Sequence, residues 1–217
     1  MRKVAVTGSL VLVVALSAAA CARETYTFTP KGRAQNRPAA ASPAASPAAS
    51  PAAADALDFP DGFTVGFQAR PATGAGAEAL DAFRQVWRSW WYAVATGGRD
   101  ARYRALLSWA PGSQNAALGR VVTGWAAEKV VPVGTIRARN VRVHAADGDR
   151  VTLVGCGDES KAGTRSLATG GVSWSFGRQK TSRYTMWITM RLEGDRWLLY
   201  AYRVLPGDHP AAKECQR

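Results

Sequence analysis

Hydrophobic positions between residues 77 and 96 recur every three or four residues, which is the period of an amphipathic helix. The apolar positions are Leu80, Phe83, Trp87, Trp90, Trp91 and Val94. Gly97 and Gly98 end the pattern. Two further helices are expected, a short one over residues 101–109 and one that begins near Ser113. The last helix is expected to bury Leu118, Val121, Val122 and Trp125. The first half of the foldable region therefore predicts three helices.

The period falls to two after residue 134, which indicates β-strands. The first strand carries Ile136 and Val143, and a change of phase near Asn140 predicts a β-bulge. Asp147-Gly148 is a hairpin turn signal. Further strands are expected over 151–155, 184–192 and 196–205, with a turn at Gly194-Asp195. Residues 157–183 are rich in Gly, Ser and Lys and show no strand pattern.

This order of elements predicts an α+β domain. Helices that precede two β-hairpins pack on one face of an antiparallel sheet, here of about four strands. The length of the foldable region is enough for one hydrophobic core.

The first 21 residues have the layout of an export signal. Arg2 and Lys3 precede an apolar run from Val4 to Leu16, and small residues then lead to Cys21. A cysteine in this place resembles a bacterial lipoprotein signal, which implies that Cys21 is lipidated and becomes the first residue of the mature chain. Cleavage by an ordinary signal peptidase, which would give a secreted protein, is one alternative. A retained transmembrane anchor is another, although the apolar run is short for a span of about 20 residues.

Residues 38–54 repeat the tetrapeptide Ser-Pro-Ala-Ala. These side chains cannot build a core, and the regular prolines prevent a stable helix. We therefore expect a signal peptide over residues 1–20, a lipid-anchored disordered tether over 21–58, and a folded domain over 75–217.

The cysteine count bears on whether Cys21 is lipidated. The chain has three cysteines, and an odd number in an exported protein requires a reason. If Cys21 carries a lipid, Cys156 and Cys215 remain, and we expect them to form a disulfide on the oxidising export route.

The net charge of the chain indicates which class of partner it could contact. The net charge of +12 favours contact with anionic lipid or anionic wall polymers. An arginine-rich composition is also common in GC-rich genomes, so the charge has a neutral explanation. Nucleic acid is not an expected partner, since no basic cluster interleaved with aromatics follows a nucleic-acid-binding module.

Three segments resemble secreted actinobacterial lipoproteins with an NTF2-like domain of the SnoaL or ketosteroid-isomerase-like kind. They are Arg88-Ser89-Trp90-Trp91, Cys156-Gly157-Asp158-Glu159-Ser160, and Trp197…Tyr202-Arg203…Cys215. The resemblance implies a curved antiparallel sheet that wraps a long helix as a cone. It implies no single activity, because the superfamily includes isomerases, dehydratases, secretion-system scaffolds and binding modules.

Few residues are arranged for catalysis. Ketosteroid-isomerase-like sites use an Asp base with a Tyr/Asp oxyanion pair. The nearest candidates here are Asp158, Tyr184, Tyr200 and Tyr202, and their spacing does not single them out. His144 and His209 are isolated, and Cys156 with Asp158 supplies too few ligands for zinc. We therefore expect no catalytic residue, no metal and no cofactor.

The tryptophans of the long helix suggest how the cone would be lined. An apolar pocket is expected, with lining from Trp87, Trp91, Met186, Ile188, Leu198 and Tyr200. A carboxylate facing a tyrosine hydroxyl in that pocket would favour an enzyme, and a filled core would favour assembly through the surface.

These observations predict a membrane-anchored lipoprotein on the extracellular face of the cell membrane, with a non-catalytic binding or scaffolding domain. The alternatives are a small-molecule enzyme of the NTF2-like isomerase or dehydratase type and an assembly subunit of an envelope or secretion complex. The sequence identifies no protein partner.

Overall fold

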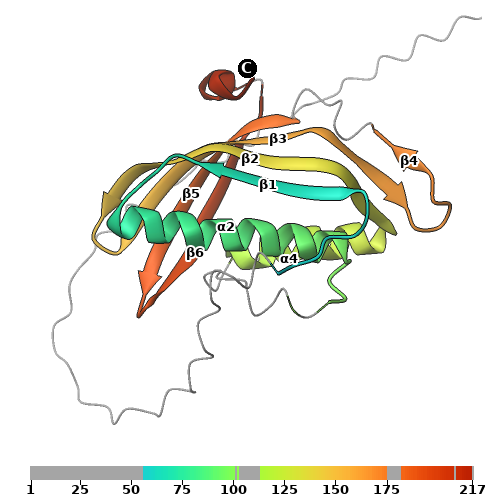
Figure 1. Ribbon diagram of the computed structural model, residues 1–217, viewed down its shortest axis with the longest axis horizontal. Coiled ribbons are helices and arrows are strands. Elements are labelled where there is room, and N and C mark those ends of the chain that lie inside the picture. Colours follow the sequence, from blue (N-terminus) through green and yellow to red (C-terminus); the bar gives the residue numbers. More distant parts are fainter. Residues whose placement is uncertain (1–55, 101, 103–112, 175–181, 208, 217) are drawn as a thin grey trace, which may run out of the picture. The chain divides into compact units, whose positions relative to one another are not determined.

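The structure, a computed structural model, describes residues 56–100, 102, 113–174, 182–207 and 209–216. All of them fall within the unit Ser46–Arg217. Their main feature is a six-stranded sheet in which β1, β2, β3, β5 and β6 lie in that order and β4 pairs with β3 (Figure 1). Strand β1 runs parallel to β2, and the other described pairs are antiparallel.

The elements follow one another along the chain with the strand β1 first. They are β1 (Phe63–Ala69), α2 (Gly74–Ala95), α4 (Ser113–Ala127), β2 (Val130–Asp147), β3 (Arg150–Ser166), β4 (Val172–Ser173), β5 (Arg183–Glu193), β6 (Arg196–Leu205) and the 3-10 helix η2 (Pro210–Gln216).

The expected arrangement of N-terminal helices on an antiparallel sheet of about four strands is wrong. A six-stranded mixed sheet dominates, and the described residues hold two α-helices, α2 and α4. Strand β1, which precedes both helices, was missed. Phe63, Val65 and Phe67 do alternate toward one face, but the strand has only seven residues and contains Gly66. Glycine is depleted in strands, so the signal was weak.

Strand β3 is also longer than the sequence pattern predicts. It does not end at Gly155 but continues to Ser166 through a stretch of low β-propensity. Its register with β2 runs from Arg150 opposite Asp147 to Ser166 opposite Val130. Pairing with β2 along its whole length, and with β5 or β4 over parts of its other edge, therefore accounts for this segment better than its own composition does. The expected helix over 101–109 lies outside the described residues except for one position.

Several local predictions are confirmed. The long helix α2 and the helix beginning at Ser113 are present. Asn140 has a φ of 52° at a shift in the β2–β3 register, which is the expected bulge. Gly148 and Gly194 occupy the two hairpin turns with positive φ values of 54° and 65°, where glycine carries no steric cost.

Helices α2 and α4 cover one face of the sheet, which we call the inner face, and η2 lies on the other, the outer face (Figure 1). The largest fully buried side chains come from α2 and the inner face: Phe83, Trp87, Tyr92, Ile136, Leu153, Met186, Ile188, Met190 and Leu199. In α4, Leu118 and Val122 are buried as expected and Trp125 packs partly, whereas Val121 is 37% exposed.

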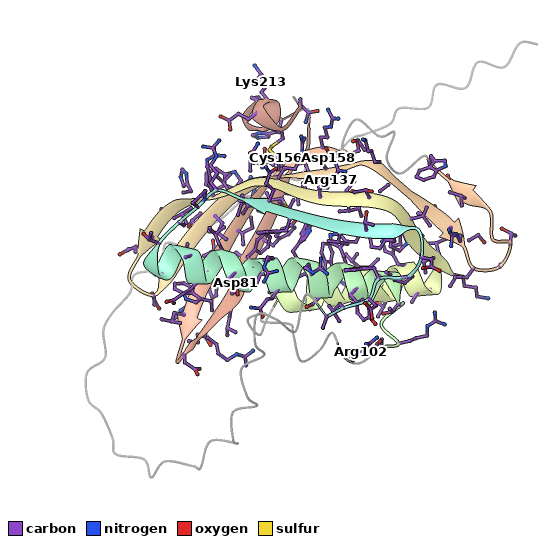
Figure 2. All side chains as sticks on the ribbon, viewed as in Figure 1. Asp81, Arg102, Arg137, Cys156, Asp158 and Lys213 are labelled. Carbon is purple, nitrogen blue, oxygen red and sulfur yellow. A yellow bond between two sulfur atoms is a disulfide. The ribbon has the colours of Figure 1, made fainter. Side chains whose placement is uncertain are left out.

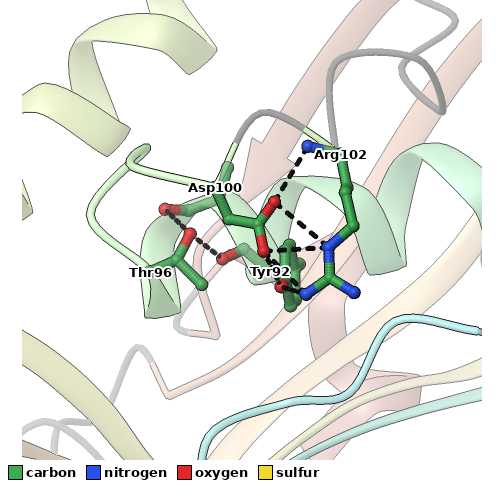
Figure 3. A network of polar contacts seen from close by, with 5 residues as sticks. Tyr92, Thr96, Asp100 and Arg102 are labelled. Carbon is green, nitrogen blue, oxygen red and sulfur yellow. Dashed lines mark hydrogen bonds and ion pairs between the residues drawn. The ribbon is translucent and has the colours of Figure 1, made fainter.

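A polar network closes the C-terminal end of α2 (Figure 3). The Tyr92 hydroxyl donates to Oδ2 of Asp100 at 2.5 Å, and Arg102 donates from Nε and Nη2 to the same oxygen at 2.9 and 2.7 Å. Thr96 Oγ1 donates to the Tyr92 carbonyl at 2.9 Å. Hydrogen bonds from Arg102 and Tyr92 hold the pKa of Asp100 well below its usual range. The network fastens the segment after the helix to its last turns.

Candidate functional site

The aromatic side chains of α2 form the interior beneath the sheet. Trp87 and Trp91 have ring centroids 5.8 Å apart, and the Trp87 indole donates to the Gly66 carbonyl of β1 at 3.2 Å. Both indoles are almost fully buried, in one cluster with Met186 and Ile188. These four of the six expected pocket residues are therefore brought together, but as packed core.

The other two expected pocket residues lie elsewhere. Tyr200 is 46% exposed and lies beside Arg150 and Arg191, whose guanidinium carbons are 5.9 and 5.7 Å from its ring centroid. Leu198 pairs with Arg191 on the same face of the sheet. The reason is a register shift between β5 and β6 that leaves Tyr200 unpaired and changes the phase of the strand. The inward positions of β6 include Trp197, Leu199 and Tyr202.

The described residues pack closely where the expected pocket would lie. A void of about 10 Å³ is left there between Phe83, Val86, Trp87, Trp90, Leu118, Leu199 and Tyr202. This is room for one water molecule at most. The expected ligand-sized apolar pocket is thus not formed by the described residues at this place.

A polar cluster lies inside, at the β3–β5 pair. The Tyr184 hydroxyl donates to Oε1 of Glu159 at 2.6 Å, and Tyr202 is hydrogen-bonded to Tyr184. Tyr184 stands directly opposite Gly157. A methyl group on Gly157 would lie 2.1 Å from Cε2 of Tyr184, so the glycine makes room for the ring.

Burial sets the proton affinities of this cluster. It raises the pKa of Glu159 to about 7, helped by the charge of Asp158 and opposed by the hydrogen bond from Tyr184. Burial also raises the pKa values of Tyr184 and Tyr202, so both hydroxyls stay protonated at neutral pH. A carboxyl group that titrates near neutrality is suited to proton transfer.

The sequence-based candidates are thus divided between the two faces. Tyr184 and Tyr202 meet on the inner face, whereas Asp158 and Tyr200 lie on the outer face. Glu159 was missed. Simple alternation from Gly157 would have placed it inward, but only if β3 had been predicted to extend beyond residue 155.

Asp158 belongs to a cationic environment on the outer face (Figure 2). Its carboxylate lies 3.2 Å from Nη2 of Arg139 and 3.7 Å from Nε of Arg183. It also accepts hydrogen bonds from the backbone and hydroxyl of Ser160 at 3.0 and 2.6 Å. Burial raises its pKa, but the Ser160 hydrogen bonds and the two arginines outweigh burial, and the pKa falls below its usual value.

The expected disulfide between Cys156 and Cys215 is present, with Cα atoms 5.3 Å apart. It fastens η2 to the outer face, together with a pair of hydrogen bonds between Arg183 and Gln216. Beside it lies a cavity of about 160 Å³ lined by Arg142, His144, Val154, Gly155, Cys156, Thr185, Trp187, Glu214 and Cys215. His144 is exposed, and its ring packs edge-on against Trp187 with the ring centroids 4.8 Å apart.

Other predictions fall outside what can be described. Cys21 and the tether up to residue 55 lie outside the described residues. Within the described part of the chain, no three His, Cys, Asp or Glu side chains are grouped to hold a metal ion. Nor does any helix there have the length and apolarity needed to cross a membrane.

Comparison with known proteins adds little. No protein-family model matches the chain, and no curated protein matches it. Among solved structures, the chain is similar to the intermembrane space region of the chloroplast protein ARC6, with a TM-score of 0.42 and 16% identity, over 63% of this chain and 99% of that one. A likeness at this level carries no functional argument. The resemblance to actinobacterial lipoproteins stays a prediction.

Proposed function

We propose that this chain is an exported lipoprotein, anchored through Cys21, whose folded domain binds or scaffolds other envelope components through its surface. The observation that carries the proposal is the Cys156–Cys215 disulfide. With these two cysteines joined, Cys21 is the one left over from the three in the chain, and the signal layout gives it a use.

The disulfide also supports export. Such bonds form and persist in oxidising compartments and are rare in reducing ones. This one closes a long loop, since its cysteines are separated by 59 in sequence, and it holds the C-terminal η2 on the sheet. Because the disulfide helps to hold the C-terminal segment on the sheet, this fold suits an oxidising, extracellular location.

The small void that the described residues leave between α2 and β6 supports a non-catalytic role. Small-molecule sites are concave spaces of several hundred Å³, whereas this void is about 10 Å³. We therefore favour binding at the exposed surface over binding in an interior pocket. The Pro/Ala-rich tether would hold that surface away from the membrane.

The anchor is tested by Cys21→Ser in the host cell. We expect wild-type protein in the membrane fraction and labelled by a palmitate analogue, and the variant released and unlabelled. The double variant Cys156→Ser/Cys215→Ser is the matched control, since it keeps Cys21 and should keep the label. An unlabelled wild-type chain, or equal labelling of Cys21→Ser, would contradict the proposal.

One observation favours a second candidate, an enzyme that transfers protons next to a carbonyl group. Glu159, with a pKa of about 7, faces the Tyr184 hydroxyl, as a base faces an oxyanion donor in such enzymes. The test is conversion of a β,γ-unsaturated ketone to its conjugated isomer, followed by absorbance. Turnover that is lost in Glu159→Gln would favour the enzyme, and no turnover above buffer would leave the non-catalytic proposal.

A further inference from the structure

An exposed tryptophan packs on the outer face of the sheet. Trp174, just after β4, is 48% exposed. A methyl group on Gly163 would lie 2.9 Å from Cε3 of its indole, and one on Gly134 would lie 3.0 Å from Cζ3. The six-membered ring of the indole therefore covers the backbone of β3 and β2, and the two glycines allow this contact. About half of the side chain is left exposed by the described residues.

Cationic side chains continue from this ring along the same face. Lys161 is two residues from Gly163 on β3 and pairs with Thr135, and Arg137 of β2 then stands opposite Asp158. Arg139 follows two residues later, with Arg183 of β5 on the other side of Asp158. We call Trp174, Lys161, Arg137, Arg139 and Arg183 the outer track. Same-face positions on a strand are about 6.6 Å apart, so the track spans several such steps.

The positive charge of the track exceeds what Asp158 can neutralise. This single carboxylate contacts Arg139 and Arg183, with Arg137 paired opposite it. The side chains of Arg139 and Arg183 are 29% and 37% exposed. Asp158 therefore orients the two guanidinium groups, and part of each side chain remains at the surface. Arginine presents its N–H donors in a fork that matches carboxylate and phosphate oxygens.

We infer that the outer track binds an acidic polysaccharide, with the face of one sugar ring stacked on Trp174 and successive acidic groups on the cations. This rests on the proposed function for the location of the protein, and it names the class of ligand. Two observations favour this polymer. The six-membered ring of the indole packs on Gly163 and Gly134, so it does not protrude for insertion into a membrane as interfacial aromatics do. The disulfide indicates a compartment outside the cytoplasm, which disfavours nucleic acid, the other polymer that stacks on aromatics between cations.

The experiment uses purified Cys21→Ser chain and immobilised sodium polygalacturonate as the acidic polysaccharide. Pullulan, a neutral glucan, controls for charge, polyphosphate controls for the sugar ring, and the oligonucleotide dT20 tests the nucleic-acid alternative. We expect polygalacturonate to bind most tightly, with an affinity that falls as salt rises.

Matched variants locate the site. Trp174→Ala and Arg137→Glu are each expected to weaken binding to polygalacturonate about tenfold, the equivalent of roughly 1.4 kcal/mol. Tyr200→Ala removes an equally exposed aromatic elsewhere on the outer face, and Arg120→Glu reverses an exposed charge on α4. Both controls should change the affinity less than twofold, and circular dichroism should show all four variants folded.

The other outcomes overturn the inference. Equal effects of Arg137→Glu and Arg120→Glu would mean diffuse attraction by net charge. Polygalacturonate binding that is unchanged by Trp174→Ala would exclude the contact between a sugar ring and the indole. Tighter binding of dT20 would replace the polysaccharide with nucleic acid. A third outcome combines the two experiments. If the wild-type chain is labelled at Cys21 in cells but the purified Cys21→Ser chain does not bind polygalacturonate, the inference is rejected and the proposed function stands.

Discussion

The inner and outer faces of the sheet differ most clearly at two consecutive residues of β3. Asp158 points outward to Arg139 and Arg183, and its pKa is lowered. Glu159 points inward to Tyr184, and burial raises its pKa to about 7. Two carboxyl groups one residue apart thus have opposite electrostatic environments. Strand alternation gives one segment both a structural and a surface role.

The same difference holds for the tryptophans. Trp87 and Trp91 fill the inner face and leave almost no space, whereas Trp174 covers two glycines and remains half exposed. Aromatic content alone therefore does not indicate a pocket. Among the described residues, the buried indoles stabilise the fold, and the exposed indole of Trp174 is a candidate for binding.

Replacement of an inner-face tryptophan should have the largest effect on stability. Trp87→Ala removes a fully buried indole and its hydrogen bond to Gly66, and we expect it to lower the free energy of unfolding by about 3–5 kcal/mol. Trp174→Ala should cost about 1 kcal/mol or less, as for a surface position. Urea denaturation measures both. Equal losses would show that the two faces are not distinct in packing.

Loss of the disulfide should have the second largest effect on the free energy of unfolding. The double variant Cys156→Ala/Cys215→Ala frees η2 from the outer face and is expected to cost about 2–4 kcal/mol. Reductant should lower the melting temperature of the wild-type protein to a similar extent. It should leave the melting temperature of the double variant unchanged. A wild-type protein whose melting temperature is insensitive to reductant would contradict this.

The pH dependence of Glu159 gives a smaller effect. Its pKa rises from an ordinary 4.5 to about 7 on folding, so the folded state binds the proton more tightly than the unfolded state does. Stability is then greatest below pH 4.5 for this group and falls as the pH rises toward 7. We expect about 2 kcal/mol less stability at pH 8 than at pH 5 from this residue.

The control for this effect is Glu159→Gln, which keeps the shape and accepts the hydrogen bond from Tyr184 without titrating. Urea denaturation at the two pH values should show that the substitution removes most of the difference. A wild-type slope of the opposite sign between pH 5 and pH 8 would show that Glu159 is ionised and stabilised in the fold.

The sequence was most informative where a segment's own pattern decides its structure. The 3.6-residue period of α2, the turns at Gly148 and Gly194, and the bulge at Asn140 are all local. The extension of β3 and strand β1 were missed because pairing partners distant in sequence determine them. Leu198 and Tyr200 were placed on the wrong face because a register shift changes the phase of β6 without a sequence signal.

The candidate sites follow the same rule. The disulfide could be predicted from the cysteine count alone. The Glu159–Tyr184 contact and the Gly163–Trp174 platform could not, because each joins residues on different strands through the registers of the long β3. The charge of the chain was visible, but its concentration around Asp158 required the pairing of β2, β3 and β5.

The central claim is that the ligand meets the outer face and does not enter the inner one. The most direct test is NMR of the indole N–H signals of ¹⁵N-tryptophan-labelled Cys21→Ser chain during titration with sodium polygalacturonate, with signals assigned by single Trp→Phe variants. The Trp174 signal is expected to shift, while those of Trp87 and Trp91 stay in place. Shifts of Trp87, Trp90 or Trp91 with an unchanged Trp174 signal would contradict the account and place the ligand under the sheet.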